Sequence, residues 1–246
     1  MRAIRLYVNQ SLAINNKLKL DDVTRHHAVN VLRLNKNSSL ALFNGDGYDY
    51  SCEILSFSKK SFDVKIISRI SVAKESPLIT NLLLGISKSS NMDYAIQKTV
   101  EAGVTSICPI VTQRAVTKPS DKSKANKHRH WLRVIMSACE QCGRATPPSL
   151  HKIIDFSGLE KLKSGEGGFV LDPGSKQPLI KFNQNDFTSI CLLVGPEGGL
   201  TKLEISEAQQ KGYQSVTCGP RVLRTETAAL SAVICAQLLW GDLSTK

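Results

Sequence analysis

Hydrophobic and polar residues alternate along the first part of the chain, up to about residue 69. Apolar side chains recur at every second position in residues 5–8, 40–42, 48–54 and 62–66. A period of two turns one face of each segment inward, so we expect four β-strands with one buried face each. Residues 44–47, Asn-Gly-Asp-Gly, tolerate positive φ and are expected to turn the chain between two strands. A small β-barrel is the natural closure of such strands.

One segment of this first part breaks the alternation and predicts a helix. It spans residues 22–34, begins with aspartates and carries histidines and arginines, among them His26 and Arg33. Such a helix face is either merely solvated or faces RNA. Arg2 and Arg5 in the same part of the chain keep the RNA interpretation open.

The hydrophobic pattern changes after residues 71–77. This segment is polar and ends in proline, and we place a domain junction there. Apolar runs of strand length alternate with helical patterns, as in a parallel α/β sheet. The predicted strands are residues 82–86, 107–111, 169–171, 190–194 and 216–218. The predicted helices run from Asn91, a candidate cap, to Gly103, from about Trp131 to Cys142, from the capping box at Thr201 and Glu204 to Gly212, and over residues 225–239. We therefore expect a β-domain over residues 1–72 and an α/β domain over residues 73–246.

The charge is strongly basic, with 32 Lys and Arg against 21 Asp and Glu and a formal net charge of +11. This charge suits a polyanionic partner, although many basic proteins bind no nucleic acid. Residues 118–133 are a basic, initially loop-like insertion rich in Lys, His and Ser. The insertion is either a solvated segment or a mobile clamp for an RNA backbone.

The seven cysteines are odd in number and lie mostly inside apolar runs, which is typical of buried, reduced thiols in the cytosol. Cys139 and Cys142 have CxxC spacing, but no second CxxC or nearby His completes a zinc site, so we expect no metal. The N-terminus lacks the apolar stretch of a signal peptide, and no run approaches the roughly 18 apolar residues of a membrane span. We therefore expect a cytoplasmic protein with no membrane partner.

Three loops in the second half follow predicted strands, at residues 172–175, 195–199 and 218–228. In an open α/β sheet, ligands collect where loops leave the carboxyl ends of strands. Glycine there lets the backbone approach a ligand closely, although a single glycine loop is equally a tight turn. Three such loops together favour a ligand site. The sequence has no GxxxxGK[ST] and no GxGxxG after its early strands, which excludes a P-loop and an ordinary dinucleotide fold.

Two of these loops carry motifs of a known family. LLVGPEGGLTKLE at residues 192–204 and CGPRVLRTETA at residues 218–228 resemble the cofactor motifs of the RsmE family in the SPOUT superfamily. QKTVEAGV at residues 97–104, EQCGR at residues 140–144 and HHAVNVLRL at residues 26–34 are similar to further motifs of this family. The departures, at Ala102, Cys142 and Cys218, remove no glycine and no charge.

This resemblance implies a PUA-like RNA-binding β-barrel followed by a SPOUT α/β domain whose C-terminal chain forms a deep trefoil knot. It also implies a homodimer, with the active site completed at the subunit interface. The implied activity is methylation of N3 of a specific uridine in the decoding region of 16S ribosomal RNA, with S-adenosyl-L-methionine as cofactor and the small ribosomal subunit as substrate.

The loops and the resemblance together give the expected site. The expected cofactor-binding residues are Leu171, Asp172, Val194, Gly195, Pro196, Glu197, Gly198, Gly199, Cys218, Gly219, Val222, Leu223, Arg224, Thr227 and Ala228. The expected RNA contacts are Arg2, Arg5, His26, Arg33, Lys88, Lys118, Lys122 and Lys124.

Methylation of an imide nitrogen requires removal of its proton, and two carboxylates in the motifs are candidates for this step. They are Glu140 and Glu197, with Arg114, Arg144 and Arg224 available to hold phosphate or to stabilise the deprotonated base. Each carboxylate also has a structural interpretation, since Glu197 can orient its own loop and Glu140 can pair with Arg144 at helical spacing. The spacing leaves both interpretations open.

Two other classes of function remain. One is a SPOUT methyltransferase that acts on tRNA or on a ribose 2′-hydroxyl, which the GPEGG motif and the N-terminal barrel disfavour. The other is a non-catalytic RNA-binding protein, which the intact glycines of all three loops disfavour.

Overall fold

The computed structural model describes residues 3–28, 34, 38–58, 61–116, 119–184 and 186–244. The chain divides into two compact units. The first comprises Met1–Glu75 with Met136–Pro147, and the second comprises Ser76–Ile135 with Pro148–Lys246. The first unit therefore takes in a segment from the middle of the chain.

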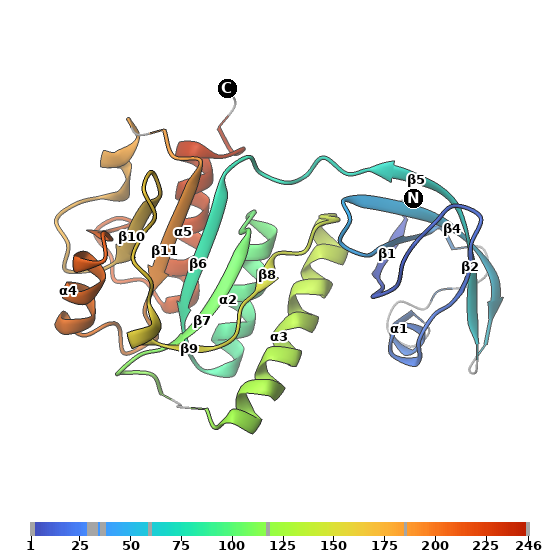
Figure 1. The fold of residues 1–246 in the computed structure, drawn as a ribbon, viewed down its shortest axis with the longest axis horizontal. Helices are drawn as coiled ribbons and strands as arrows, with labels where there is room; N and C mark the ends of the chain where they lie inside the picture. Colours follow the sequence, from blue (N-terminus) through green and yellow to red (C-terminus); the bar gives the residue numbers. More distant parts are fainter. Residues whose placement is uncertain are drawn as a thin grey trace. The chain divides into compact units, whose positions relative to one another are not determined.

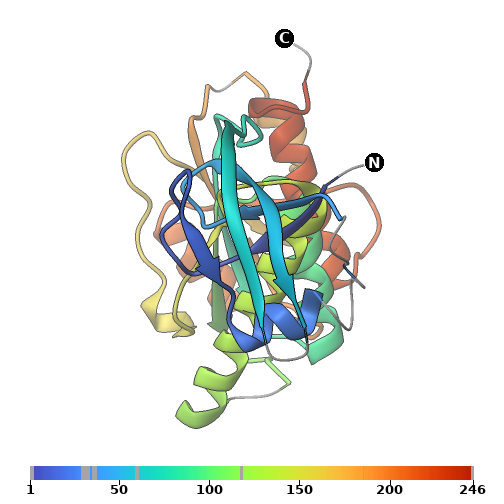
Figure 2. The ribbon, with the colours of Figure 1, turned by 90° about the vertical axis from the view of Figure 1, so that its right-hand side faces the viewer.

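The first unit is built on a five-stranded sheet of order β1-β3-β4-β5-β2. The strands are β1 (Ile4–Tyr7), β2 (Lys17–Lys19), β3 (Leu40–Phe43), β4 (Tyr48–Phe57) and β5 (Phe62–Ser71). Only β1 and β3 pair in parallel. Phe62, Val64 and Ile66 are buried at alternate positions, as the period of two predicts. Figure 2 shows the twist of these strands, drawn in blue to cyan.

The second unit is built on a seven-stranded sheet in which every pair is parallel. The main strand order is β12-β10-β11-β6-β7-β8, and β9 pairs with β7. The strands are β6 (Ile79–Gly85), β7 (Ser106–Val111), β8 (Ser149–Leu150), β9 (Ile154–Asp155), β10 (Gly167–Leu171), β11 (Ser189–Val194) and β12 (Gln214–Val216). Because the strands are parallel, the loops that follow them gather at one edge.

Helices cover both faces of this sheet. They are α2 (Ser89–Glu101), α4 (Lys202–Gln210) and α5 (Thr225–Trp240), with 3₁₀ turns at Phe156–Gly158 and Leu179–Phe182. Helix α3 (Asp121–Cys142) begins in this unit and its residues from Met136 on belong to the first. Figure 1 shows α2 and α5 side by side against the sheet, and Trp240 of α5 stacks on Phe169 of β10 with ring centroids 5.6 Å apart. On the other face, Val170 and Leu193 pack with Ala208 of α4.

Several helix boundaries differ from the sequence prediction. Residues 121–133 belong to α3 and are not a loop, because Asp121 stands at the positive end of the helix dipole and Trp131 is buried within the same helix. The α-helix expected over residues 22–34 is described only as α1 (Asp22–His26). Helix α2 begins before Asn91, whose side chain makes no cap. The capping box of α4 is confirmed, since Thr201 and Glu204 bond reciprocally.

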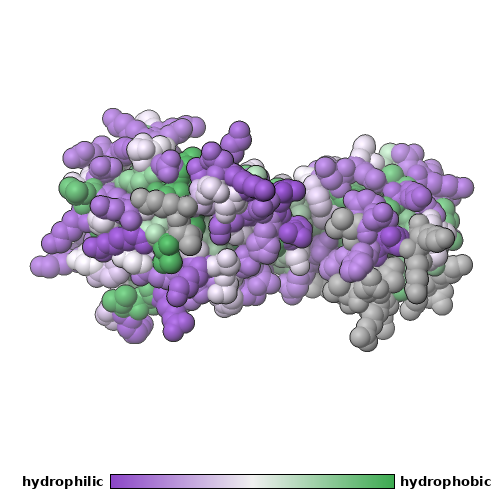
Figure 3. Space-filling view, turned by 90° about the horizontal axis from the view of Figure 1, so that it is seen from below, coloured by the Kyte–Doolittle hydropathy of each residue, from purple (hydrophilic) through white to green (hydrophobic). Residues whose placement is uncertain are grey.

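The face of the molecule drawn in Figure 3 is mostly hydrophilic, with apolar atoms in small patches. All seven cysteines are free thiols, and burial raises the pKa of Cys139 to about 12. Within the described ranges, no group of three or more His, Cys, Asp or Glu side chains is placed to hold a metal ion. The part of the chain that the structure describes contains no helix long and apolar enough to cross a membrane.

Candidate active site

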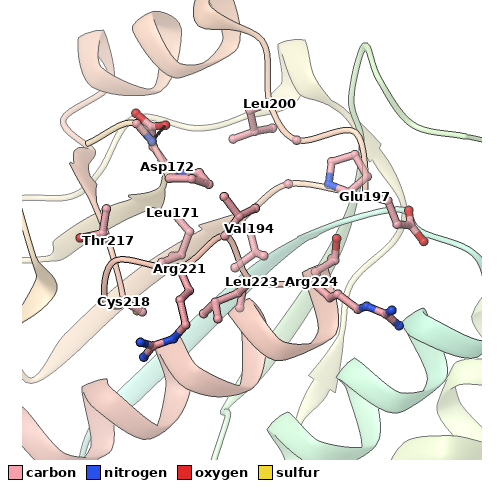
Figure 4. A pocket seen from close by; sticks show the side chains of 18 of the residues that line it. Leu171, Asp172, Val194, Glu197, Leu200, Thr217, Cys218, Arg221, Leu223 and Arg224 are labelled. Atoms are coloured by element: carbon pink, nitrogen blue, oxygen red, sulfur yellow. Dashed lines mark hydrogen bonds between the residues drawn. The ribbon is translucent and has the colours of Figure 1, made fainter. Parts of the chain in front are cut away.

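A cavity of about 670 Å³ lies at the carboxyl ends of β10, β11 and β12. The three predicted loops line most of the cavity. The lining residues include Leu171 and Asp172, Val194 with the glycine loop that follows it, and the first turn of α5. Figure 4 shows Leu171, Val194 and Leu223, from three different segments, pointing into the middle of this space. The sheet thus brings together residues that are far apart in the sequence.

Most of the expected cofactor-binding residues line this cavity, and only Gly198 and Thr227 do not. The cavity is also lined by residues that the sequence analysis did not select for the cofactor: Asn91, Arg114, Pro173, Gly174, Leu200, Ile205, Val216, Thr217, Arg221, Thr225 and Glu226. Thr217 and Glu226 lie beside or inside the quoted motifs, so those motifs were sufficient to find them. Asn91 lies in α2, and no sequence spacing connects it to the loops.

Two glycines of this site stand where another residue would be crowded or strained. A Cβ added at Gly195 would lie 3.0 Å from the backbone nitrogen of Leu200, and Gly219 has a φ of +93°. Gly85, at the end of β6, is more crowded still and was missed by the sequence analysis. A Cβ there would lie 2.5 Å from the backbone nitrogen of Pro196. Gly85 therefore lets the glycine loop rest directly on the neighbouring strand.

Asp172 shapes the first loop of the site. Its Oδ1 accepts a hydrogen bond from the Gly174 backbone N–H at 2.8 Å, and its Oδ2 accepts one from the Ser215 hydroxyl at 2.8 Å. Both carboxylate oxygens therefore have protein donors. Asp172 fixes the turn after β10 against β12.

Glu197 joins the glycine loop to the start of α2. Its Oε1 accepts hydrogen bonds from the Lys88 backbone N–H and from the Asn91 side-chain amide, both at 2.9 Å. Burial alone would raise the pKa of Glu197, but hydrogen bonds from Lys88, from its own backbone N–H and from Asn91 outweigh it and lower the pKa. A carboxylate with a lowered pKa accepts protons poorly, so this geometry favours the loop-orienting interpretation of Glu197.

Arg114 supports the same loop from the turn that follows β7. Its exposed side chain donates from Nη1 to the Gly198 carbonyl oxygen at 3.1 Å. A Cβ at Gly198 would lie 3.0 Å from the Cβ of Arg114. Both ends of the Arg114 side chain, its Cβ and its guanidinium, therefore lie against Gly198 of this loop.

Glu140 and Arg144 both belong to the first unit and do not form the expected pair with each other. Arg144 is 5% exposed and its Nε donates to Glu75 Oε2 at 3.1 Å. Glu140 Oε1 accepts from the Tyr7 backbone N–H at 2.9 Å, and its Oε2 lies 3.6 Å from His27 Nε2. Burial raises the pKa of Glu140, against the opposing effects of these two donors.

Replacing Glu140 with glutamine is expected to stabilise the protein in a pH-dependent way. Because the folded-state pKa is raised, the contribution of Glu140 to stability is complete below its usual value near 4.5 and is lost as pH rises through the folded-state value. Glutamine accepts the Tyr7 hydrogen bond without this loss. Urea unfolding should show the variant gaining free energy of unfolding over the wild type from pH 4 to pH 7. A difference that stays constant, or falls, over this range would contradict the pKa direction.

The expected RNA contacts have different environments. The prediction that Arg5 contacts RNA is corrected, because this residue is only 8% exposed. Its guanidinium donates to the Asp49 carboxylate at 2.7 Å and to the Cys139 carbonyl oxygen at 2.6 Å. These bonds make Arg5 a structural residue. Four of the expected RNA contacts have side chains without buried bonds of this kind: His26, Lys88, Lys122 and Lys124. Lys124 pairs with Asp121 at 3.4 Å. Arg2, Arg33 and Lys118 lie outside the described residues.

Comparison with known proteins agrees with both units. A model described as an RNA methyltransferase domain matches residues 74–237, and one described as an RNA methyltransferase PUA domain matches residues 20–67. The chain is 32% identical to the ribosomal RNA small subunit methyltransferase E of Buchnera aphidicola subsp. Schizaphis graminum over 99% of both chains. It is 32% identical to the Bacillus subtilis protein of the same name over 88% of this chain and 90% of the relative.

A solved structure is similar over the whole chain. It is the ribosomal RNA small subunit methyltransferase E of Neisseria gonorrhoeae bound to S-adenosyl methionine, with a TM-score of 0.90 and 34% identity over 99% of this chain and 100% of that one.

Proposed function

The chain belongs to the RNA methyltransferase family that includes the ribosomal RNA small subunit methyltransferases E, and we propose that it methylates N3 of a uridine in the decoding region of 16S ribosomal RNA. The methyl donor in this proposal is S-adenosylmethionine and the substrate is the small ribosomal subunit in the cytoplasm. The observation that carries the proposal is the cavity at the carboxyl ends of β10, β11 and β12, whose glycine loops carry the family motifs.

The cavity fits a cofactor of the nucleoside class. Its volume of about 670 Å³ lies within the usual range for small-molecule sites. Leu171, Val194 and Leu223 offer apolar surface to an adenine ring, while Gly195 and Gly219 expose backbone polar groups. When bound, S-adenosylmethionine supplies an electrophilic methyl group. The similar Neisseria structure carries this molecule, which supports the assignment.

The proposed acceptor atom places demands on the RNA and on the protein. N3 lies on the pairing edge of uracil, so the target base has to be unpaired or extruded. Among the two candidate proton acceptors, Glu197 is held by several donors that lower its pKa, whereas burial raises the pKa of Glu140. Glu197 lines the cavity and Glu140 belongs to the first unit, so both carboxylates stay candidates for proton removal. Arg114 and Arg224 are assigned to phosphate or to the developing negative charge on the base.

The proposal includes the trefoil knot and the homodimer that the family resemblance implies. The composition of α5 supports the homodimer, because this helix is apolar on nearly all sides and a helix of this kind needs a partner on each face. Leu230, Ile234 and Leu238 follow one another at a spacing of four residues, on a face that remains partly or fully exposed in the single chain, with Leu238 49% exposed. This stripe is the proposed contact with the second subunit.

Replacing Leu238 with arginine is expected to convert the dimer to a monomer, because a charge would be buried within the contact. Sedimentation velocity measures this directly. Leu203→Arg is the matched control, since Leu203 is a 73% exposed leucine of α4, away from the stripe. A Leu238 variant that sediments as the wild type does would exclude this surface as the interface.

The experiment that tests the proposed function is transfer of a tritiated methyl group from S-adenosylmethionine to small subunits that lack modifications. We expect label in the 16S RNA, and faster labelling of the assembled subunit than of a protein-free transcript. An absence of label in both substrates would refute the proposal.

A further inference from the structure

The cavity is lined by three carboxylates that differ in their hydrogen bonding. Asp172 accepts from Gly174 and Ser215, and Glu197 accepts from Lys88 and Asn91. Glu226 is the exception. Its Oε2 is buried and has no hydrogen-bond partner among the residues that the structure describes.

An unpaired buried carboxylate oxygen destabilises a folded chain, because it has lost water without gaining a donor. Two arginines of the same cavity, Arg221 and Arg224, are close to Glu226 in sequence. Neither forms an ion pair with it, and no ion pair found within the described ranges includes Glu226. The dipole of α5 favours a negative charge at this second helical position, but it supplies no donor to Oε2.

Glu226 lines the cavity, but its Oε2 is shielded from the open space, so the carboxylate has to turn to meet a donor on a ligand. S-adenosylmethionine has one cationic N–H donor, its α-ammonium group, and a charged donor is the best partner for a carboxylate. The last torsion of a glutamate side chain is broad and nearly two-fold, so the carboxylate can turn toward a donor at little cost.

We propose that Glu226 is a cofactor-binding residue whose carboxylate accepts a hydrogen bond from the α-ammonium group of S-adenosylmethionine. This inference rests on the proposed function, because it takes that molecule as the occupant of the cavity. It assigns to Glu226 a ligand contact and no part in the folding of the chain. The unpaired oxygen then destabilises the free protein and gains its hydrogen-bond partner when the cofactor binds.

The test is calorimetric titration of the full-length Glu226→Gln protein with S-adenosylmethionine and with S-adenosylhomocysteine. Both molecules carry the α-ammonium group, and only the first carries the sulphonium charge. We expect both affinities to fall by a similar factor of about 10 to 100, the size of a hydrogen bond to a charged group. The melting temperature without ligand should be unchanged or higher. Glu207→Gln, at an exposed position of α4, is the matched control and should change neither quantity.

The other outcomes overturn the inference in distinguishable ways. A loss confined to S-adenosylmethionine would move the contact to the sulphonium, and unchanged affinities with slower turnover would move it to the RNA. A clearly lower melting temperature without ligand would make Glu226 a structural residue. A wild-type protein that binds neither molecule would refute the proposed function itself.

Discussion

Substituting Gly85 with alanine is expected to weaken cofactor binding strongly. The added Cβ would lie 2.5 Å from the nitrogen and 2.6 Å from the Cδ of Pro196, and 2.8 Å from the carbonyl carbon of Gly195. Two of these three atoms are backbone atoms, which cannot move aside as a flexible side chain can. The glycine loop must therefore shift away from β6. Since overpacking of this kind costs up to about 3 kcal/mol, affinity for S-adenosylmethionine should fall by about 100-fold.

Calorimetry on the Gly85→Ala protein measures this loss, and Gly158→Ala provides the matched control. Gly158 belongs to the same unit, and a Cβ there would lie at an ordinary 3.7 Å from its nearest neighbour, the Cβ of Ile154. The control should bind as the wild type does. If Gly85→Ala also kept an affinity within twofold of the wild type, the loop would not depend on its contact with β6.

Replacing Arg5 with methionine is expected to lower the free energy of unfolding by about 3 kcal/mol, the low end for breaking a buried ion pair, because 25% of the Asp49 side chain is exposed. The substitution leaves the Asp49 carboxylate without the two hydrogen bonds that Arg5 donates to it. It also leaves the carbonyl oxygens of Cys139 and Arg144 without this donor. Arg5 therefore joins β1 to the segment of the first unit that comes from the middle of the chain.

Urea unfolding followed by circular dichroism measures this destabilisation. Arg25→Met is the control, because Arg25 pairs with an Asp22 side chain that is 89% exposed, and surface pairs contribute little. A stable Arg5→Met protein that has lost only its RNA affinity would restore the interpretation of Arg5 as a phosphate contact.

The sequence predicted the second unit well, because hydrophobic runs and glycine loops are both local signals. A buried parallel strand is a continuous apolar run, and each of the five predicted runs overlaps an observed strand of this unit. Parallel pairing then requires the following loops to meet at one edge. The cavity at residues 171–174, 194–200 and 216–228 follows from that rule.

The features that the sequence analysis missed depend on contacts between distant segments. Glu197 bonds to Asn91, 106 positions away, and no local pattern encodes that pair. Gly85 ends an ordinary apolar strand, and its importance comes only from the backbone of Pro196 beside it. Arg5 resembles a surface arginine in sequence, yet its partners Asp49 and Cys139 bury it.

Identification of the methylated nucleoside is the most direct test of the proposed activity. Unmodified small subunits would be incubated with the protein and S-adenosylmethionine, and the 16S RNA would be digested to nucleosides and separated by chromatography with mass detection. The proposed function predicts 3-methyluridine, at one site in the decoding region. A product methylated on the ribose 2′-hydroxyl, or a methylated base other than uracil, would contradict it.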